Sequence, residues 1–297
     1  MPLIQYKSIA FKPESIELIA LINDVLYEYE SLGYQLTLRQ AYYQLVARGH
    51  IPNTERSYKN IGNLINNARL AGLIDWDFIT DRTRNLRSVV HWDEPSQIVT
   101  AAMKQYHLDW WEDQPDYVEV WVEKDALIDI VEKASRPLDV PYFSCRGYTS
   151  QSEMWAAAQR FIGRCTAGKL CHIVHLGDHD PSGIDMSRDI QERLRMFGIE
   201  VDVRRIALTM DQIELFNPPP NPAKLTDSRC KSYIRRFGNK SWELDALEPQ
   251  VIRSLIECEV QAFVDKDVRD RTIARENAGR SLLENVCDEL ISREESI

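Results

Sequence analysis

Between residues 117 and 208 the chain repeats one pattern, an apolar strand followed by a helix, and this repeat restricts the fold more than any other feature of the sequence. Helices are expected to begin near Lys124, to cover about 151–163 and to follow the third strand. Strands that alternate with helices imply βα units, so we predict an α/β, Rossmann-like domain with a mainly parallel sheet. The four expected strands lie in YVEVWV (117–122), PYFSCRGYTS (141–150), KLCHIVHL (169–176) and EVDVRRIAL (200–208).

A different pattern precedes this repeat. Residues 14–31 carry apolar residues at helical spacing, and TLRQ, starting at Thr37, has the form of a capping box that opens a second helix. A third helix is expected at about 56–70, and LIDWDFITDRTRNLRSVVHW (73–92) reads as short strands around a basic turn. Three helices followed by a small hairpin predict a winged helix.

The polar segment WWEDQPD (110–116) contains a proline and marks the predicted domain boundary. We therefore predict a winged-helix domain over 1–112 and a sheet domain with a helical C-terminal extension over 113–297. In that extension the proline-rich NPPPNPAK (217–224) is a connector, and the segment after WELDAL carries a helical apolar stripe. The mixed charges of 266–280 indicate a solvated helix face.

Composition limits the classes of function. The formal net charge of −10 over 297 residues argues against coating nucleic acid by bulk attraction, but it leaves room for a local basic face. Six scattered cysteines without a Cys-x-x-Cys pair indicate neither zinc nor disulfides, which is typical of a reduced, cytoplasmic interior. The N-terminus does not resemble a secretory signal, and no apolar run is long enough to span a bilayer, so no membrane partner is expected.

Three acidic residues follow two of the predicted strands. Glu123 comes directly after the first strand, and Asp178 and Asp180 come after the third, in HLGDHDPSG. The carboxyl ends of neighbouring parallel strands meet in one crevice, and oxygen ligands there suit Mg²⁺ or Mn²⁺. Two other interpretations remain open: the aspartates are helix caps and surface acids, or they form the Asp-x-Asp pair that phosphatases and glycosyltransferases also contain.

The order VEKDA, RGYTSQS, HLGDHDPSG resembles the Toprim domain of topoisomerases, primases and some nucleases. It is most similar to the A subunit of topoisomerase VI and its meiotic double-strand-break relatives. The resemblance implies that Glu123, Asp178 and Asp180 hold magnesium. It also implies a nucleophilic tyrosine on a preceding winged helix, in a motif like Arg-x-x-Tyr-Tyr.

The sequence TLRQAYYQLV supplies such a motif with Arg39, Tyr42 and Tyr43. In helical register Tyr42 falls on the apolar stripe, whereas Tyr43 falls off it, on the same face as Arg39. We therefore predict that Tyr42 is a core residue, that Tyr43 is the exposed nucleophile and that Arg39 clamps the phosphate. The alternative is that both tyrosines simply pack the helix.

Several polar side chains are candidates for contacts with DNA, either to base edges or to phosphates. The third helix presents most of them opposite its apolar stripe, the basic turn adds arginines, and the loop after the second strand adds one more. A merely polar surface is the alternative interpretation. The candidates are Lys59, Asn60, Asn63, Asn67, Arg69, Arg82, Arg84, Arg87 and Arg146.

Three functions follow from these patterns. The first is metal-dependent cleavage of double-stranded DNA by a tyrosine transesterase of the type IIB topoisomerase kind, for which the resemblance implies a homodimer. No phosphate-binding glycine-rich loop is present, so an ATP-driven reaction would need a separate ATPase subunit. The second is a Toprim nuclease that activates water, and the third is a DNA-binding protein without enzymatic activity.

Overall fold

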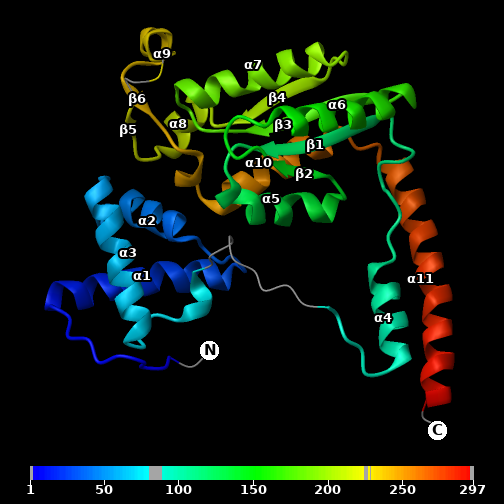
Figure 1. Ribbon diagram of the computed structural model, residues 1–297, viewed down its shortest axis with the longest axis horizontal. Coiled ribbons are helices and arrows are strands. Elements are labelled where there is room, and N and C mark those ends of the chain that lie inside the picture. Colours follow the sequence, from blue (N-terminus) through cyan, green and yellow to red (C-terminus); the bar gives the residue numbers. More distant parts are fainter. Residues whose placement is uncertain (1–2, 80–88, 224–226, 228, 295–297) are drawn as a thin grey trace.

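A four-stranded parallel sheet forms the centre of the molecule (Figure 1). The structure is a computed structural model that describes residues 3–79, 89–223, 227 and 229–294. The spatial order of the strands is β2-β1-β3-β4, and all neighbours are parallel, which confirms the predicted α/β class. The strands are β1 (Asp116–Val122), β2 (Tyr142–Ser144), β3 (Leu170–Leu176) and β4 (Asp202–Ala207).

Helices cover both faces of this sheet, which explains why its strands read as continuous apolar runs. Trp121 and Ile173 point to the face that α6 and α7 cover, whereas Val120 and Val174 point to the face covered by α5 and α10 (Figure 1). The four helices are α5 (Ile128–Ser135), α6 (Gln151–Thr166), α7 (Pro181–Met196) and α10 (Pro249–Gln261). Short 3₁₀ turns, η2 (Asp125–Leu127) and η3 (Arg136–Leu138), flank α5.

Three helices pack together at the N-terminal end of the chain, where three were predicted: α1 (Pro13–Ser31), α2 (Leu38–Ala47) and α3 (Glu55–Leu70). They pack together through apolar residues at helical spacing, although Ile16 of the expected stripe is exposed. The predicted capping box is present, because the Thr37 hydroxyl accepts from the Gln40 backbone N–H and the Gln40 side chain accepts from the Thr37 N–H.

The predicted wing is only partly within the described residues. The basic turn with Arg82, Arg84 and Arg87 lies outside them. On its N-terminal side the chain forms a 3₁₀ turn, η1 (Trp76–Phe78), and Ile79 makes a single parallel bridge to Leu36. The described residues therefore contain three helices and one bridge of the expected winged helix.

After β4 the chain forms small elements beside the sheet, and α9 lies farthest from the N-terminal helices (Figure 1). Among them, β5 and β6 pair as antiparallel strands on either side of α9, and η4 packs against α2. They are α8 (Met210–Phe216), β5 (Asn221–Pro222), α9 (Cys230–Phe237), β6 (Lys240–Ser241) and η4 (Leu244–Ala246).

Two helices from distant parts of the sequence lie side by side and project from the sheet domain (Figure 1). They are α4 (Pro95–Gln105), which precedes the predicted domain boundary, and α11 (Lys266–Glu294). All six cysteine thiols are free, as predicted. No described helix combines the length and apolar character that a membrane crossing requires.

Candidate functional site

The carboxyl ends of β1 and β3 lie next to each other, as the metal-site prediction requires. Val122 pairs with Leu176 at the ends of the two strands, and the Glu123 N–H donates to the Leu176 carbonyl at 2.8 Å. The segments that leave these strands, Glu123–Lys124 and Gly177–Asp180, therefore meet at one edge of the sheet. This is the edge at which open parallel sheets bind their ligands.

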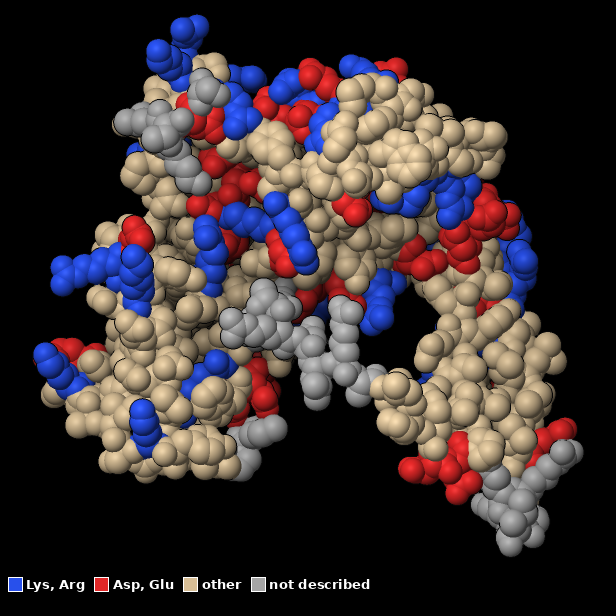
Figure 2. All heavy atoms as spheres, viewed as in Figure 1, with Lys and Arg blue, Asp and Glu red and all other residues tan. Residues whose placement is uncertain are grey.

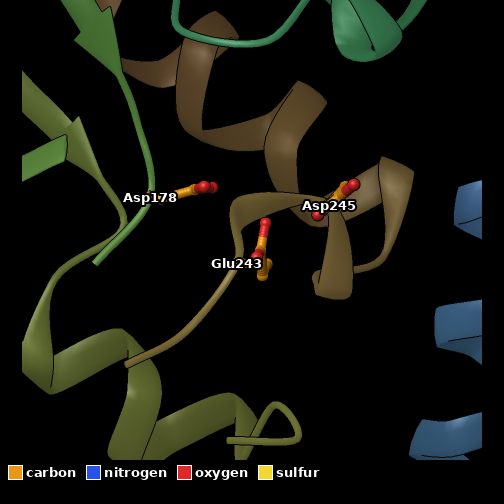
Figure 3. Close-up of side chains that lie close together, drawn as sticks. All are labelled: Asp178, Glu243 and Asp245. Atoms are coloured by element: carbon orange, nitrogen blue, oxygen red, sulfur yellow. The ribbon is translucent and has the colours of Figure 1, made fainter. Parts of the chain in front are cut away.

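Asp178 is buried at this edge, with only 5% of its surface exposed. Its Oδ1 accepts a hydrogen bond from the Leu244 N–H at 2.8 Å, and its Oδ2 lies 2.9 Å from Lys124 Nζ. Figure 3 shows the Asp178 side chain pointing from the end of β3 toward the segment that carries Glu243 and Asp245. Asp178 thus faces residues 243–245, which are distant from it in the sequence.

Asp178, Glu243 and Asp245 form a compact group that we call the acid cluster. One carboxylate oxygen from each lies within 4.8 Å of the others. Glu243 precedes η4 and Asp245 lies within it, so the short turn of WELDAL presents two acids to Asp178 (Figure 3). Three carboxylates this close require a cation or a proton between them.

Two cationic side chains meet that requirement. Lys124 Nζ lies 3.1 Å from Asp245 Oδ1 and also contacts Glu243 and Asp178. Arg39, which reaches the cluster from α2, donates from Nε to Asp245 at 2.8 Å and from Nη2 to Glu243 at 2.7 Å. Three negative and two positive side chains leave one formal negative charge, and Figure 2 shows acidic and basic side chains interspersed on the face in view.

The pKa values reflect this balance. Burial alone would raise the pKa of Glu243, but Lys124 and Arg39 lower it to about 2. Burial alone would lower the pKa of Lys124, but its three carboxylate partners raise it. Burial also raises the pKa of Asp178, an effect that Lys124 opposes and the neighbouring acids reinforce. The cluster is therefore held together by the charged form of Lys124.

The donor set of the acid cluster fits a hard divalent cation. All three donors are carboxylates, and ligand oxygens around Mg²⁺, each at about 2.0–2.1 Å, lie roughly 3–4 Å from one another. The oxygens of the cluster approach this spacing, and the position among them is taken by the Lys124 ammonium group. A divalent cation at this position would replace Lys124 as the partner of the three acids.

The other two predicted metal ligands have different partners. Glu123 Oε2 accepts the Asp178 N–H at 2.9 Å, and burial raises its pKa. Asp180 is the N-cap of α7, and its Oδ1 accepts the Gly183 N–H at 2.6 Å, which is the capping role that the sequence also allowed. Of the predicted three, the structure brings only Asp178 into the acid cluster, so the assignment of Glu123 and Asp180 to metal stays a prediction.

Hydrogen bonds from β4 hold the loop between β3 and α7 in place. Arg205 of β4 donates to the carbonyl oxygens of Asp178 and Gly177, at 2.6 and 2.8 Å, and burial lowers its pKa. A Cβ at Gly183 would collide with the Asp178 carbonyl oxygen, which explains why glycine follows Pro-Ser in this loop. The loop therefore fixes the direction of Asp178.

The prediction that Tyr43 lies on an exposed helix face is wrong. Tyr43 is 5% exposed, about as buried as Tyr42, because η4 and β5 cover the side of α2 that an isolated helix would expose. Its hydroxyl accepts one long hydrogen bond from Asn221 Nδ2 at 3.4 Å, and the Arg39 guanidinium lies 5.6 Å from its ring centre. Burial raises the pKa of Tyr43, and the lowering effect of Arg39 is smaller.

Tyr42 is a core residue, as predicted, and its hydroxyl is fully used. It donates to Asn53 Oδ1 at 3.0 Å and accepts from the Thr54 N–H at 2.9 Å. Through these contacts Tyr42 holds the start of α3 against α2. The two tyrosines thus share burial but differ in how strongly their hydroxyls are engaged.

The predicted DNA-contacting residues fall into three groups. Those on α3 are exposed, although Lys59 pairs with Glu55 at 2.7 Å; this group is Lys59, Asn60, Asn63 and Asn67. Arg69 is instead tied to η1, because its Nη2 donates to the Trp76 and Ile79 carbonyls at 2.6 Å. Arg146 is exposed and pairs with Asp125 at 3.1 Å, whereas Arg82, Arg84 and Arg87 lie outside the described residues.

Sequence reasoning missed the roles of Lys124, Glu243 and Asp245. Lys124 stands inside VEKDA, beside a residue that was identified. The Glu-x-Asp spacing of WELDAL was the available signal for the other two, but nothing local ties that segment to Asp178. The contact depends on the path of the chain through β5 and β6.

No family model matches the chain, and no curated protein is similar enough to count as a relative.

Proposed function

We propose that this protein is a metal-dependent DNA-cleaving transesterase similar to the A subunit of topoisomerase VI, with the N-terminal helices as a winged helix and the sheet as a Toprim domain. The observation that carries the proposal is the contact between α2 and the acid cluster. Arg39, four residues before Tyr43, binds Glu243 and Asp245 directly. A candidate nucleophile and a candidate metal site are thus neighbours at the ligand-binding edge of a parallel sheet.

In the proposed reaction the Tyr43 hydroxyl oxygen attacks a backbone phosphorus. A bond forms between Tyr43 and phosphorus, the bond from phosphorus to the 3′-oxygen breaks, and the phenolic proton is lost as the 3′-oxygen gains one. The products are a 5′-phosphotyrosyl link and a free 3′-hydroxyl. Arg39 would hold the phosphate through its guanidinium group.

In the acid cluster, Asp178, Glu243 and Asp245 would hold Mg²⁺ or Mn²⁺. Glu123 accepts the Asp178 N–H, and Asp180 follows Asp178 in the same loop. When bound there, the ion would stabilise negative charge on the phosphate and on the leaving oxygen. Without it, the single excess negative charge of the cluster repels a phosphate. Metal and DNA are therefore expected to bind together.

In this proposal the structure represents a closed state, in which Tyr43 and Arg39 cannot reach a DNA phosphate. Tyr43 is buried, and Arg39 is occupied by carboxylates rather than by phosphate. Cleavage therefore requires α2 to move away from η4, which exposes the tyrosine and frees two acids in one step. In a homodimer, the same movement would allow Tyr43 of one copy to serve the acids of the other.

Double-stranded DNA is the proposed substrate, and it would bind to the exposed side of α3 and to Arg146. Binding to that local surface would release counterions, so affinity is expected to fall steeply with salt despite the net charge of −10. The same proposal includes a separate ATPase subunit for a reaction in which one DNA segment passes through the break in another. It also includes a cytoplasmic location at the nucleoid.

Covalent capture tests the proposal. Labelled duplex DNA is incubated with the full chain and Mg²⁺ or Mn²⁺, the mixture is denatured, and DNA joined to protein is measured. We expect adducts with wild type, none with Tyr43→Phe, and adducts with the matched control Tyr42→Phe, which loses hydrogen bonds to Asn53 and Thr54 but not the nucleophile. Cutting by Tyr43→Phe at the wild-type rate would overturn the tyrosine mechanism.

A Toprim nuclease that activates water is the second candidate, and the burial of Tyr43 favours it. Hydrolysis needs the acid cluster but no tyrosine. In the same experiment it predicts nicked DNA that is free of protein, equally with wild type and with Tyr43→Phe. Loss of cutting only when Asp178 is replaced would support this candidate.

A further inference from the structure

A cavity of about 200 Å³ lies beside Tyr43, between α2, the start of α3 and β5. The proposed chemistry uses two of its lining residues, Arg39 and Tyr43. The others are two more tyrosines, Tyr42 and Tyr58, the amides of Asn53 and Asn221, and Thr54 and Glu55 at the start of α3. The cavity thus combines aromatic rings and amides at the place where the cleaved phosphate must enter.

The aromatic part is rigid. Tyr42 makes edge-to-face contacts with Tyr43 and with Tyr58, each with ring centres 5.3 Å apart. Tyr58 is the least buried of the three rings and forms the outer part of the lining. Fixed aromatic rings of this kind are the surfaces on which proteins stack unpaired nucleic-acid bases.

The amide part is organised in the same way. Asn53 Nδ2 donates to Asn221 Oδ1 at 2.7 Å, and Asn53 Oδ1 is fixed by the Tyr42 hydroxyl at 3.0 Å. The bond from Asn221 Nδ2 to the Tyr43 hydroxyl is long, 3.4 Å, so this N–H is weakly engaged. Asparagine amides match the donors and acceptors of base edges.

We propose that this cavity takes one unstacked base of the DNA, the base next to the phosphate that Tyr43 attacks, and that it does so in the closed arrangement, before α2 moves away from η4. The inference rests on the proposed function and adds a substrate preference to it. Because a base must leave the duplex to enter, cleavage favours positions where unstacking is easy, such as mispaired bases and flexible pyrimidine–purine steps. The protein then selects sites by DNA deformability, not by reading a sequence.

The test measures binding alone, with Tyr43→Phe protein that cannot form adducts. Two duplexes are compared, one fully paired and one with a single central mismatch, in Mg²⁺ and at one salt concentration. We expect at least about tenfold tighter binding to the mismatched duplex, because a mispaired base is easier to unstack than a paired one. Tyr58→Ala in the same background should lose this preference, and the matched control Tyr58→Phe, which keeps the ring, should retain it.

A second variant protects the test against unfolding. Tyr58→Trp narrows the cavity without removing packing, and it should also lose the preference for the mismatch. Equal affinity of the parent protein for both duplexes would overturn the cavity proposal and leave the transesterase proposal standing. A mismatch preference without adducts from wild-type protein would support base binding in the cavity and overturn the transesterase proposal. Absence of DNA binding would overturn both proposals.

Discussion

Two groups of acids lie at the same edge of the sheet and differ in what faces them. The acid cluster is held by the side-chain cations of Lys124 and Arg39, whereas Glu123 and Asp180 are held by backbone N–H groups. A carboxylate that accepts from backbone N–H groups stabilises the loops that supply them. One bound to a side-chain cation can exchange that cation for another, so the comparison identifies the acid cluster as the better candidate for metal.

The largest expected effect separates Asp178 from Asp180. Asp178→Asn removes a charge from the acid cluster and should lower adduct formation at least about 1000-fold, a loss equivalent to about 4 kcal/mol of transition-state stabilisation. Asp180→Asn preserves the cap of α7, because asparagine caps helices as well as aspartate does, and should keep activity within a few-fold. Equal losses in both variants would instead support the three metal ligands predicted from the sequence.

The next effect concerns stability. Lys124→Met leaves Asp178 and Asp245 buried without their shared cation and should lower the free energy of unfolding by about 3–5 kcal/mol. Urea denaturation with and without Mg²⁺ measures this, and Mg²⁺ should restore part of the loss by binding the folded state alone. The control Lys59→Met removes an exposed pair and should change stability by less than about 1 kcal/mol. A Lys124→Met protein as stable as wild type would contradict the charge balance described above.

The third effect concerns His175, which lies near the end of β3. His175 is fully buried and donates to or accepts from Ser187 at 2.8 Å; burial, followed by Arg205, lowers its pKa to about 3. The folded protein therefore keeps His175 neutral while the unfolded chain binds a proton below pH 6.5, so stability falls as pH falls through this window. The expected slope is about 1.4 kcal/mol per pH unit, or about 2 kcal/mol between pH 6.5 and 5.

The measurement is the free energy of unfolding at several pH values in that window. His179, whose pKa burial lowers to about 4, adds a similar slope. His175→Gln should therefore lower the slope by up to about 1.4 kcal/mol per pH unit relative to wild type, whatever its effect on absolute stability. An unchanged slope would mean that His175 is protonated in the folded protein.

The smallest effect tests the cap itself. Asp180→Ala should be about 1 kcal/mol less stable than Asp180→Asn, because alanine leaves the Gly183 N–H without its partner. Thermal unfolding of the two variants measures the difference. A gap above about 3 kcal/mol would show that Asp180 does more than cap α7.

The sheet and most helices were predictable because their signals are local. The alternation of strands and helices, the capping box at Thr37 and the apolar stripe of α1 each lie within a short stretch of sequence. The adjacency of β1 and β3 was a condition of the metal-site prediction, and only the structure shows it. Local reasoning likewise gave both possible roles of Asp180, as a ligand and as a cap.

The acid cluster and the burial of Tyr43 were not predictable in the same way. Helical periodicity identifies the face that one neighbour covers, but α2 is covered on a second side by η4 and β5. The partners of Asp178 come from residues 243–245, and only the folded path of the chain brings them there. The missing information is long-range, and it concerns the residues that carry charge.

The contact between Arg39 and the acids has a consequence for how the protein is made. Arg39 is separated from Glu243 by 204 residues and from Asp245 by 206, so this contact forms late compared with those inside each helix bundle or sheet. During synthesis the N-terminal helices leave the ribosome long before residues 243–245 exist. Until then Tyr43 lacks the cover of η4 and β5, and the nascent chain carries its tyrosine uncovered beside an incomplete set of acids.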